Sequence, residues 1–155
     1  MPKDNEYFLR EALKEACKAE AKGEVPVGAV ITLGDRIVGR GHNRNITLRD
    51  PTAHAEIIAL RKAAKKLNNY RLPDCKIFVT VEPCPMCAGA LIWARVSEIV
   101  FGAYDPKAGA CGSVIDIPSE RRFNHRIQVT GGLLEHDCRT LLQQFFKRKR
   151  KQCGS

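Results

Sequence analysis

The sequence predicts an α/β fold in which one sheet of five strands carries helices on both of its faces. Two observations lead to this prediction. Short apolar runs rich in β-branched residues alternate along the chain with longer segments whose apolar residues recur at helical spacing. The segments follow in the order helix, strand, strand, helix, strand, helix, strand, long loop, strand, helix, and such alternation is typical of layered α/β domains.

The first element is a helix predicted over residues 4–22, with Asp4 or Asn5 as its N-cap and Gly23 at its end. Its apolar residues share one stripe, as in a surface helix with a single buried face. That stripe consists of Phe8, Leu9, Ala12, Leu13, Ala16 and Ala19.

A hairpin is predicted next. Residues 25–31 are apolar and β-branched, residues 34–35 form a turn, and residues 37–43 return as a second strand. Residues 44–52 are a polar loop, and Thr52 at its end is the expected N-cap of the following helix.

The middle of the chain alternates between the two kinds of element. We expect a helix over residues 54–67, a strand over 76–81, a second helix over 84–95 and a strand over 98–103. The helix over 84–95 has almost no charge and is therefore expected to be buried. The crossover through it should be right-handed, which makes the later strands parallel to part of the sheet.

The C-terminal third begins with an irregular stretch over residues 105–125, with a short helical piece expected near 119–122. A structureless loop of this length in a compact domain is usually functional. A short strand over 126–130, a turn at 131–132 and an amphipathic helix over 133–150 complete the chain. The residues expected to face inward from this helix are Leu134, Cys138, Leu141, Leu142 and either Phe145 or Phe146.

The composition fits one globular domain over residues 1–155, with 44% hydrophobic and 28% charged residues. No apolar run approaches the ~18 residues of a membrane span, and the N-terminus lacks a secretory signal. We therefore expect a cytoplasmic protein with no membrane partner. The net charge of +9, to which the basic run 147–151 contributes, predicts a polyanionic partner, most simply nucleic acid.

The chain has seven cysteines. An odd number in a chain expected to be intracellular favours metal binding by some and simple burial of others over disulfides. The residues interpreted as buried or incidental are Cys17, Cys75, Cys111, Cys138 and Cys153.

Two short motifs carry the chemistry: His-Ala-Glu at residues 54–56 and Pro-Cys-Pro-Met-Cys at residues 83–87. Both lie at predicted helix starts. Cys84 and Cys87 are three residues apart and therefore share one helix face. The dipole at a helix N-terminus favours their thiolates, which are the forms that bind metal.

A catalytic Zn²⁺ site has three protein ligands and one open position. His54, Cys84 and Cys87 supply three ligands, which leaves the fourth position to a water whose pKa the metal lowers. Glu56 follows the histidine by two residues and is the expected proton shuttle for that water. The alternative is a structural site with four ligands, which needs a further Cys or one of His42, His125 or His136.

These motifs match the signature of the zinc-dependent nucleobase deaminases, and the resemblance extends along nearly the whole chain. The chain resembles the bacterial tRNA-specific adenosine deaminases in residues 25–29, 43–44, 50–56, 82–90, 101–109, 124–126 and 145–148. The resemblance implies a three-layer α/β/α fold of the cytidine deaminase type with a five-stranded mixed sheet, and a homodimer with one Zn²⁺ per subunit. It also implies hydrolysis of adenosine to inosine at the wobble position of a tRNA anticodon stem-loop.

The resemblance further assigns four substrate-binding residues. Asn43 matches a base- and ribose-contacting asparagine, and Val27 matches an apolar wall of the base pocket. Asp105 lies where the family approaches the neighbouring nucleotide, and an acceptor there can read a 2′-OH. Phe145 belongs to the C-terminal helix beside the anticodon loop. The ordinary alternatives are a turn former for Asn43, a core residue for Val27, a loop aspartate before proline for Asp105, and a solvated tail for the basic helix.

Two other functions are consistent with the residues. One is deamination of a free base or nucleoside such as guanine, cytosine or cytidine, although such an enzyme has little need of a net charge of +9. The other is a non-catalytic RNA-binding module with a structural zinc.

Overall fold

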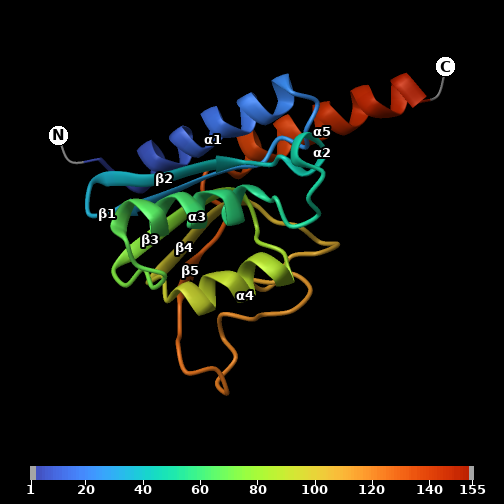
Figure 1. Ribbon diagram of the computed structural model, residues 1–155. Coiled ribbons are helices and arrows are strands. Elements are labelled where there is room, and N and C mark those ends of the chain that lie inside the picture. Colours follow the sequence, from blue (N-terminus) through green and yellow to red (C-terminus); the bar gives the residue numbers. More distant parts are fainter. Residues whose placement is uncertain (1–2, 154–155) are drawn as a thin grey trace.

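The computed structural model describes residues 3–153, with the side chain of Cys153 outside the described part. It contains a single five-stranded sheet between two layers of helices (Figure 1). The elements are α1 (Asn5–Ala21), β1 (Gly28–Leu33), β2 (Arg36–His42), α2 (Asn45–Leu48), α3 (Ala55–Leu67), β3 (Cys75–Val81), α4 (Pro85–Ala94), β4 (Glu98–Ala103), β5 (Gln128–Thr130) and α5 (Glu135–Cys153).

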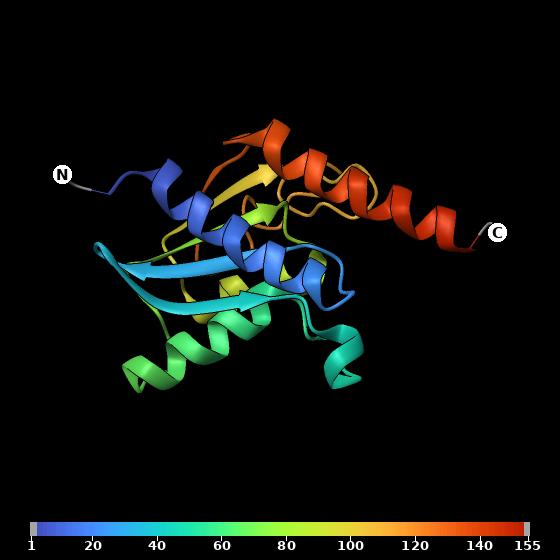
Figure 2. The same ribbon diagram turned by 90° about the horizontal axis from the view of Figure 1, so that it is seen from above.

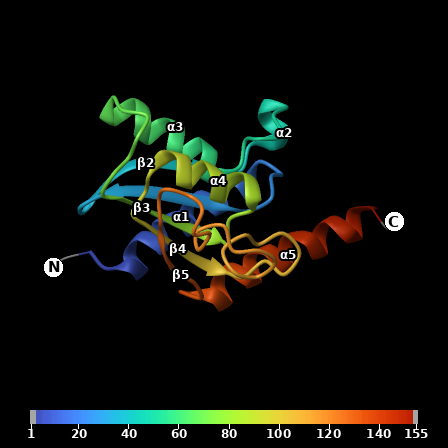
Figure 3. The ribbon, with the colours of Figure 1, turned by 90° about the horizontal axis from the view of Figure 1, so that it is seen from below.

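The strand order is β2-β1-β3-β4-β5. Strand β1 pairs antiparallel with β2 and β3, whereas β3, β4 and β5 are parallel. The sheet is therefore mixed, which confirms the predicted fold class, including the hairpin and the parallel crossover through α4. Helices α1 and α5 cover one face (Figure 2), and α3 and α4 cover the other (Figure 3).

The core has two parts, one on each face of the sheet. The larger lies between the sheet and helices α3 and α4, and the smaller lies beneath α1 and α5. Helix α1 approaches β1 so closely that a Cβ on Gly28 would lie 2.0 Å from the carbonyl oxygen of Ala12. On the opposite face, a Cβ on Gly41 would lie 2.4 Å from the carbonyl oxygen of Ala55. Glycine thus allows both helices to sit directly on the hairpin.

The ends of α1 follow the sequence prediction. Asp4 is the N-cap, and its carboxylate accepts a hydrogen bond from the backbone nitrogen of Tyr7 at 2.8 Å. Gly23 follows the helix with φ of +76°. The apolar stripe is inward, but Glu11 and Glu15 are also buried, which the pattern did not predict. Glu11 pairs with Arg40 of β2 at 2.8 Å, and Glu15 contacts Nδ1 of His42 of β2 at 3.3 Å, so both carboxylates attach α1 to the hairpin.

Several predicted boundaries were wrong. The N-cap of α3 is His54, not Thr52, because the peptide at 52–54 turns once more before the helix begins. The polar loop 44–52 contains the short helix α2. The first strand begins only at Gly28, since the backbone turns between Val25 and Val27.

The C-terminal third also differs in detail. Residues 119–122 form turns rather than a helical piece, and the last strand is only three residues long. The turn before α5 lies at residues 133–134, where Leu134 has φ of +52°, instead of at 131–132. Cys75, Cys111 and Cys138 are buried as expected, whereas Cys17 is exposed.

Helix α4 is not buried on all sides. Trp93 is 82% exposed, and Met86 on the same helix is also exposed. Low charge therefore indicated an apolar helix but did not show what covers it. Within residues 3–153, none of the helices combines the length and the hydropathy of a membrane span.

Candidate active site

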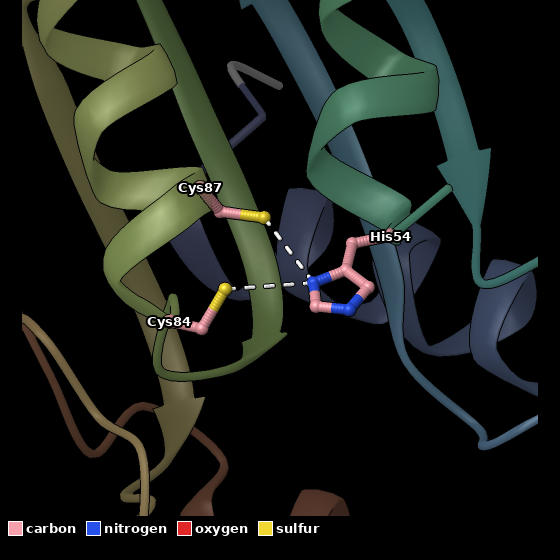
Figure 4. A group of neighbouring side chains, drawn as sticks. All are labelled: His54, Cys84 and Cys87. Atoms are coloured by element: carbon pink, nitrogen blue, oxygen red, sulfur yellow. Dashed lines mark hydrogen bonds between the residues drawn. The ribbon is translucent and has the colours of Figure 1, made fainter. Parts of the chain in front are cut away.

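The three predicted metal ligands meet where two helices begin. His54 is the N-cap of α3, Cys84 is the N-cap of α4, and Cys87 lies in the first turn of α4. The Nδ1 atom of His54 lies 3.5 Å from the Sγ atom of Cys84 and 3.5 Å from that of Cys87 (Figure 4). All three donor atoms lie within 4.8 Å of one another.

This donor set fits Zn²⁺. With Zn–N of about 2.0 Å and Zn–S of about 2.3 Å, a tetrahedral ion separates nitrogen from sulfur by about 3.5 Å. No fourth Cys, His, Asp or Glu of the described residues joins the group. The predicted set of three is thus brought together, and the four-ligand alternative with His42, His125 or His136 is not.

The thiols of Cys84 and Cys87 have shifted pKa values. Hydrogen bonding with Cys87, together with His54, lowers the pKa of Cys84 to about 4, while the contact with Cys84 and burial raise the pKa of Cys87. A metal ion binds both cysteines as thiolates, with release of any thiol proton, as is general for thiolate ligands.

Glu56 lies in the first turn of α3, two residues after His54, and is only 3% exposed. Burial raises the pKa of its carboxyl to about 7, although nearby His54 acts in the opposite direction. Its carboxyl also interacts with Cys87. A carboxyl whose pKa is near neutrality can accept a proton and return it, which suits the predicted shuttle.

Asn43 is buried between the hairpin and α3. Its side-chain oxygen accepts a hydrogen bond from the backbone nitrogen of Ala55 at 2.8 Å, and its backbone nitrogen donates to the carbonyl of Val27 at 3.1 Å. Asn43 therefore links Val27 to the start of α3, beside His54. Val27 is half-buried against the larger core.

Asp105 is the second residue of the loop after β4. Its carboxylate accepts hydrogen bonds from the backbone nitrogens of Lys107 at 3.0 Å and Ala108 at 3.2 Å. Its own backbone nitrogen donates to Glu82 at 3.0 Å. Asp105 thus sits in a defined turn, half-exposed at the molecular surface.

The C-terminal half of α5 extends past the sheet on the side where α2 lies (Figures 1 and 3). A surface hollow there is lined by Asp105, Lys107, Phe146, Lys149 and Arg150. Phe145 instead faces inward at 6% exposure, with its ring 5.5 Å from that of Phe146. The structure thus brings Asp105 to the basic helix, but the aromatic side chain that faces this hollow is Phe146.

Two buried carboxylates near the site were missed by sequence reasoning. Glu82 holds the loop that carries Asp105, and Glu24 holds α2, which follows Asn43. Burial raises the pKa of each carboxyl, but hydrogen bonds from backbone and hydroxyl groups outweigh it and leave both below the ordinary value. For Glu82 a signal existed, since it directly precedes the Pro-Cys motif.

Comparison with known proteins agrees with this geometry. Residues 2–103 match the family model described as the cytidine and deoxycytidylate deaminase zinc-binding region. The tRNA-specific adenosine deaminase of Bacillus subtilis is 46% identical over 148 residues, which cover 96% of this chain and 92% of the relative. The Haemophilus influenzae tRNA-specific adenosine deaminase is 48% identical over 149 residues, which cover 96% and 86%.

Solved structures agree as well. One from a study of A-to-I editing by tRNA:A34 deaminases superposes with a TM-score of 0.85 at 42% identity, covering 88% of this chain and 99% of the other. A guanine deaminase from Nitrosomonas europaea gives a TM-score of 0.75 at 29% identity, covering 90% and 83%. The chain therefore belongs to the cytidine and deoxycytidylate deaminase family of zinc proteins, within its branch of tRNA-specific adenosine deaminases.

Proposed function

We propose that this protein hydrolyses adenosine to inosine, with release of ammonia, at the wobble position of a tRNA anticodon. The observation that carries the proposal is the convergence of His54, Cys84, Cys87 and Glu56 at two helix starts. That site stands in a chain 46–48% identical over 96% of its length to tRNA-specific adenosine deaminases.

His54, Cys84 and Cys87 would hold one Zn²⁺ per subunit. When bound, the ion supplies an activated water for attack on C6 of adenine, as is general for zinc-dependent nucleobase deaminases. Glu56 takes one proton from the attacking water and delivers it to N1 of the ring. It then takes the second proton, from the hydroxyl now bound to C6, and delivers that one to the departing amine, which leaves as ammonia. Its burial keeps bulk water away from the proton that it carries.

The substrate contacts are assigned to residues around this centre. The side-chain oxygen of Asn43 is already occupied by Ala55, so its amide N–H₂ is the group offered to the base or ribose. Val27 forms an apolar wall for the base. Asp105, half-exposed on its turn, accepts from the 2′-OH of a neighbouring nucleotide, which favours RNA over DNA.

Helix α5 supports binding of the anticodon stem-loop. Its basic run 147–151 is exposed and adjoins Asp105 in the hollow described above. The resemblance assigns Phe145 to this helix, but its ring is buried and packs beneath the surface, so its exposed neighbour Phe146 is the side chain available for stacking on a base. This helix belongs to the single domain that we assign to residues 1–155.

We infer that the protein is a homodimer and that it works in the cytoplasm. The exposed face of α4 supports the first inference. Ile92, Trp93 and Phe123 line a pocket there, and Gly89 in the middle of the helix has open space where a Cβ would stand. Glycine inside a helix costs about 1 kcal/mol relative to alanine, and a neighbour packed closely on this face would account for it. The second inference rests on two zinc-binding thiols that must stay reduced.

The dimer can be tested with a Trp93→Lys variant. A charge in the middle of an apolar interface should dissociate the dimer, which light scattering after size-exclusion chromatography measures directly. Lys62→Glu on the outer face of α3 provides a charge-changing control that should leave the mass unchanged. A monomeric wild-type protein, or a Trp93→Lys variant that stays dimeric, contradicts the assignment of this face.

The function can be tested with an anticodon stem-loop that carries A at the wobble position. The zinc-loaded protein should convert it to inosine, whereas a stem-loop with G there should be unchanged. Because a guanine deaminase shares the fold, free guanine, cytosine and cytidine should be assayed in parallel. Faster turnover of a free base or nucleoside would contradict the proposal, as would RNA binding without deamination, which would indicate a binding module.

A further inference from the structure

The side chain of Glu82 joins the metal-binding half of the site to the loop that carries Asp105. Glu82 follows β3 directly, stands two residues before Cys84 and is 3% exposed. Its carboxylate accepts hydrogen bonds from the backbone nitrogens of Asp105, Cys111 and Ser113, each at 3.0 Å, and from the hydroxyl of Ser113. Four donors from one loop thus converge on a single buried carboxylate.

The loop is shaped around this carboxylate. A Cβ on Gly109 would lie 2.4 Å from the carboxyl carbon and Oε1 of Glu82, so only glycine leaves room for the acid. The backbone supports the same contact, because Ala110 donates to the carbonyl of Pro83 at 2.8 Å and Glu82 donates to that of Ala103 at 2.8 Å. Residues 105–113 are therefore wrapped over the segment that leads into the metal ligands.

A carboxylate suits this position better than any neutral group. Its two oxygens offer about four acceptor sites, which match the four donors. An amide offers one oxygen, and its NH₂ would face backbone N–H groups that have no other acceptor. Such charge-assisted hydrogen bonds are about twice as strong as neutral ones.

We propose that Glu82 is a positioning residue that holds residues 105–113 in register with the metal site, so that Asp105 meets the nucleotide beside the flipped adenosine. The proposal rests on the proposed function of Asp105 in RNA recognition. Glu82 touches neither substrate nor metal and acts through the loop. Its loss should therefore weaken substrate binding and RNA preference while leaving the chemical step intact.

The test is a Glu82→Gln variant, assayed for zinc content and for steady-state deamination of the stem-loop. We expect full zinc content, a KM raised about tenfold and a kcat within about threefold of wild type. The reason is that the variant loses about one charge-assisted hydrogen bond between residue 82 and the loop. A variant that is merely less stable would lose active fraction, lowering kcat at unchanged KM. Glu6→Gln, an exposed change of the same kind on α1, should leave both constants unchanged.

Two further variants change the loop side of the contact between Glu82 and residues 105–113. Ser113→Ala removes only the hydroxyl donor and should raise KM about threefold. Gly109→Ala displaces the carboxylate and should raise KM about as much as Glu82→Gln does. The double variant should have a KM only slightly above that of either single variant, because both changes break the same contact. These variants decide the question if Glu82→Gln does not fold.

A separate measurement, the preference for RNA over DNA, tests whether Glu82 acts through Asp105. Glu82→Gln should lower the preference for the RNA stem-loop over its DNA counterpart, and adding Asp105→Asn should lower it no further. In the free protein, hydrogen exchange at the amides of Asp105, Cys111 and Ser113 should accelerate. An unchanged KM, loss of zinc with loss of kcat, or unchanged exchange at those amides would overturn the proposal. Exchange is measured without substrate, so it tests Glu82 even if the wild type fails to deaminate the stem-loop.

Discussion

Replacing Glu24 by Gln should destabilise the protein strongly, although Glu24 lies outside every recognised motif. Its carboxylate is 1% exposed and accepts hydrogen bonds from the backbone nitrogens of Ile46 at 3.1 Å and Thr47 at 2.7 Å, and from the Thr47 hydroxyl at 2.7 Å. The contact holds α2, which begins two residues after Asn43, against the segment that enters β1.

The magnitude follows from those three bonds. Each hydrogen bond to a charged group contributes about 1.5–3 kcal/mol. Glutamine keeps one acceptor oxygen but turns an NH₂ toward the remaining donor, so we expect a loss of about 2–4 kcal/mol in the free energy of unfolding, from a total of about 5–15 kcal/mol. Urea denaturation measures the change. As matched controls, Thr47→Ser keeps the hydroxyl and should be near wild type, whereas Thr47→Ala removes one of the three bonds and should cost about 1.5–3 kcal/mol.

The same carboxylate should make stability depend on pH. Burial raises the pKa of Glu24, but the hydrogen bonds from Thr47 and Ile46 outweigh it, so the pKa in the folded state lies below 4.5. The stabilisation is therefore complete above pH 4.5 and is lost as the pH falls through the folded-state pKa. The difference in unfolding free energy between wild type and Glu24→Gln should shrink on acidification. A destabilisation below about 0.5 kcal/mol at neutral pH would show that the Glu24 carboxylate does not hold α2 in place.

Three further predictions concern packing and RNA binding. Gly28→Ala forces a Cβ to within 2.0 Å of the Ala12 carbonyl and should lower the free energy of unfolding by about 3 kcal/mol or more; an unchanged thermal midpoint would contradict the close packing of α1. Asp105→Asn should reduce the ratio of RNA deamination to DNA deamination. The same ratio in the variant as in the wild type would reject the contact of Asp105 with the 2′-OH. Removing residues 147–155 should weaken stem-loop affinity and flatten its dependence on salt, whereas an unaltered slope would make the run a solvated tail.

Much of the molecule could be predicted from sequence because its signals are local. Apolar periodicity located the five strands and the long helices, and residue type with spacing identified His54, Cys84 and Cys87 before any geometry was known. Cap geometry was less accessible: Thr52 has the right chemistry for an N-cap, but the helix begins after His54. A backbone turn of one or two residues leaves no periodic signal, which also explains the missed helix α2.

Buried charge was the other source of error. Glu24 lies outside every motif and Glu82 directly precedes one, but the roles of both depend on donors 22 to 31 residues away. Helix α4 shows the opposite case, since its apolar composition suggested burial but Trp93 is exposed. Composition shows whether a surface is apolar or polar, whereas the tertiary structure, or a partner chain, determines what covers it.

The role of Glu56 as proton shuttle at a zinc site is tested by comparing wild-type and Glu56→Gln proteins, each carrying one zinc, on the stem-loop with A at the wobble position. Both should bind zinc and RNA equally, because Glu56 is assigned neither role. The wild type should form inosine, and the variant should be slower by about a thousandfold, within the range of a lost general acid–base group. Inosine formation by zinc-loaded Glu56→Gln at the wild-type rate, or none by the zinc-loaded wild type, would contradict the account.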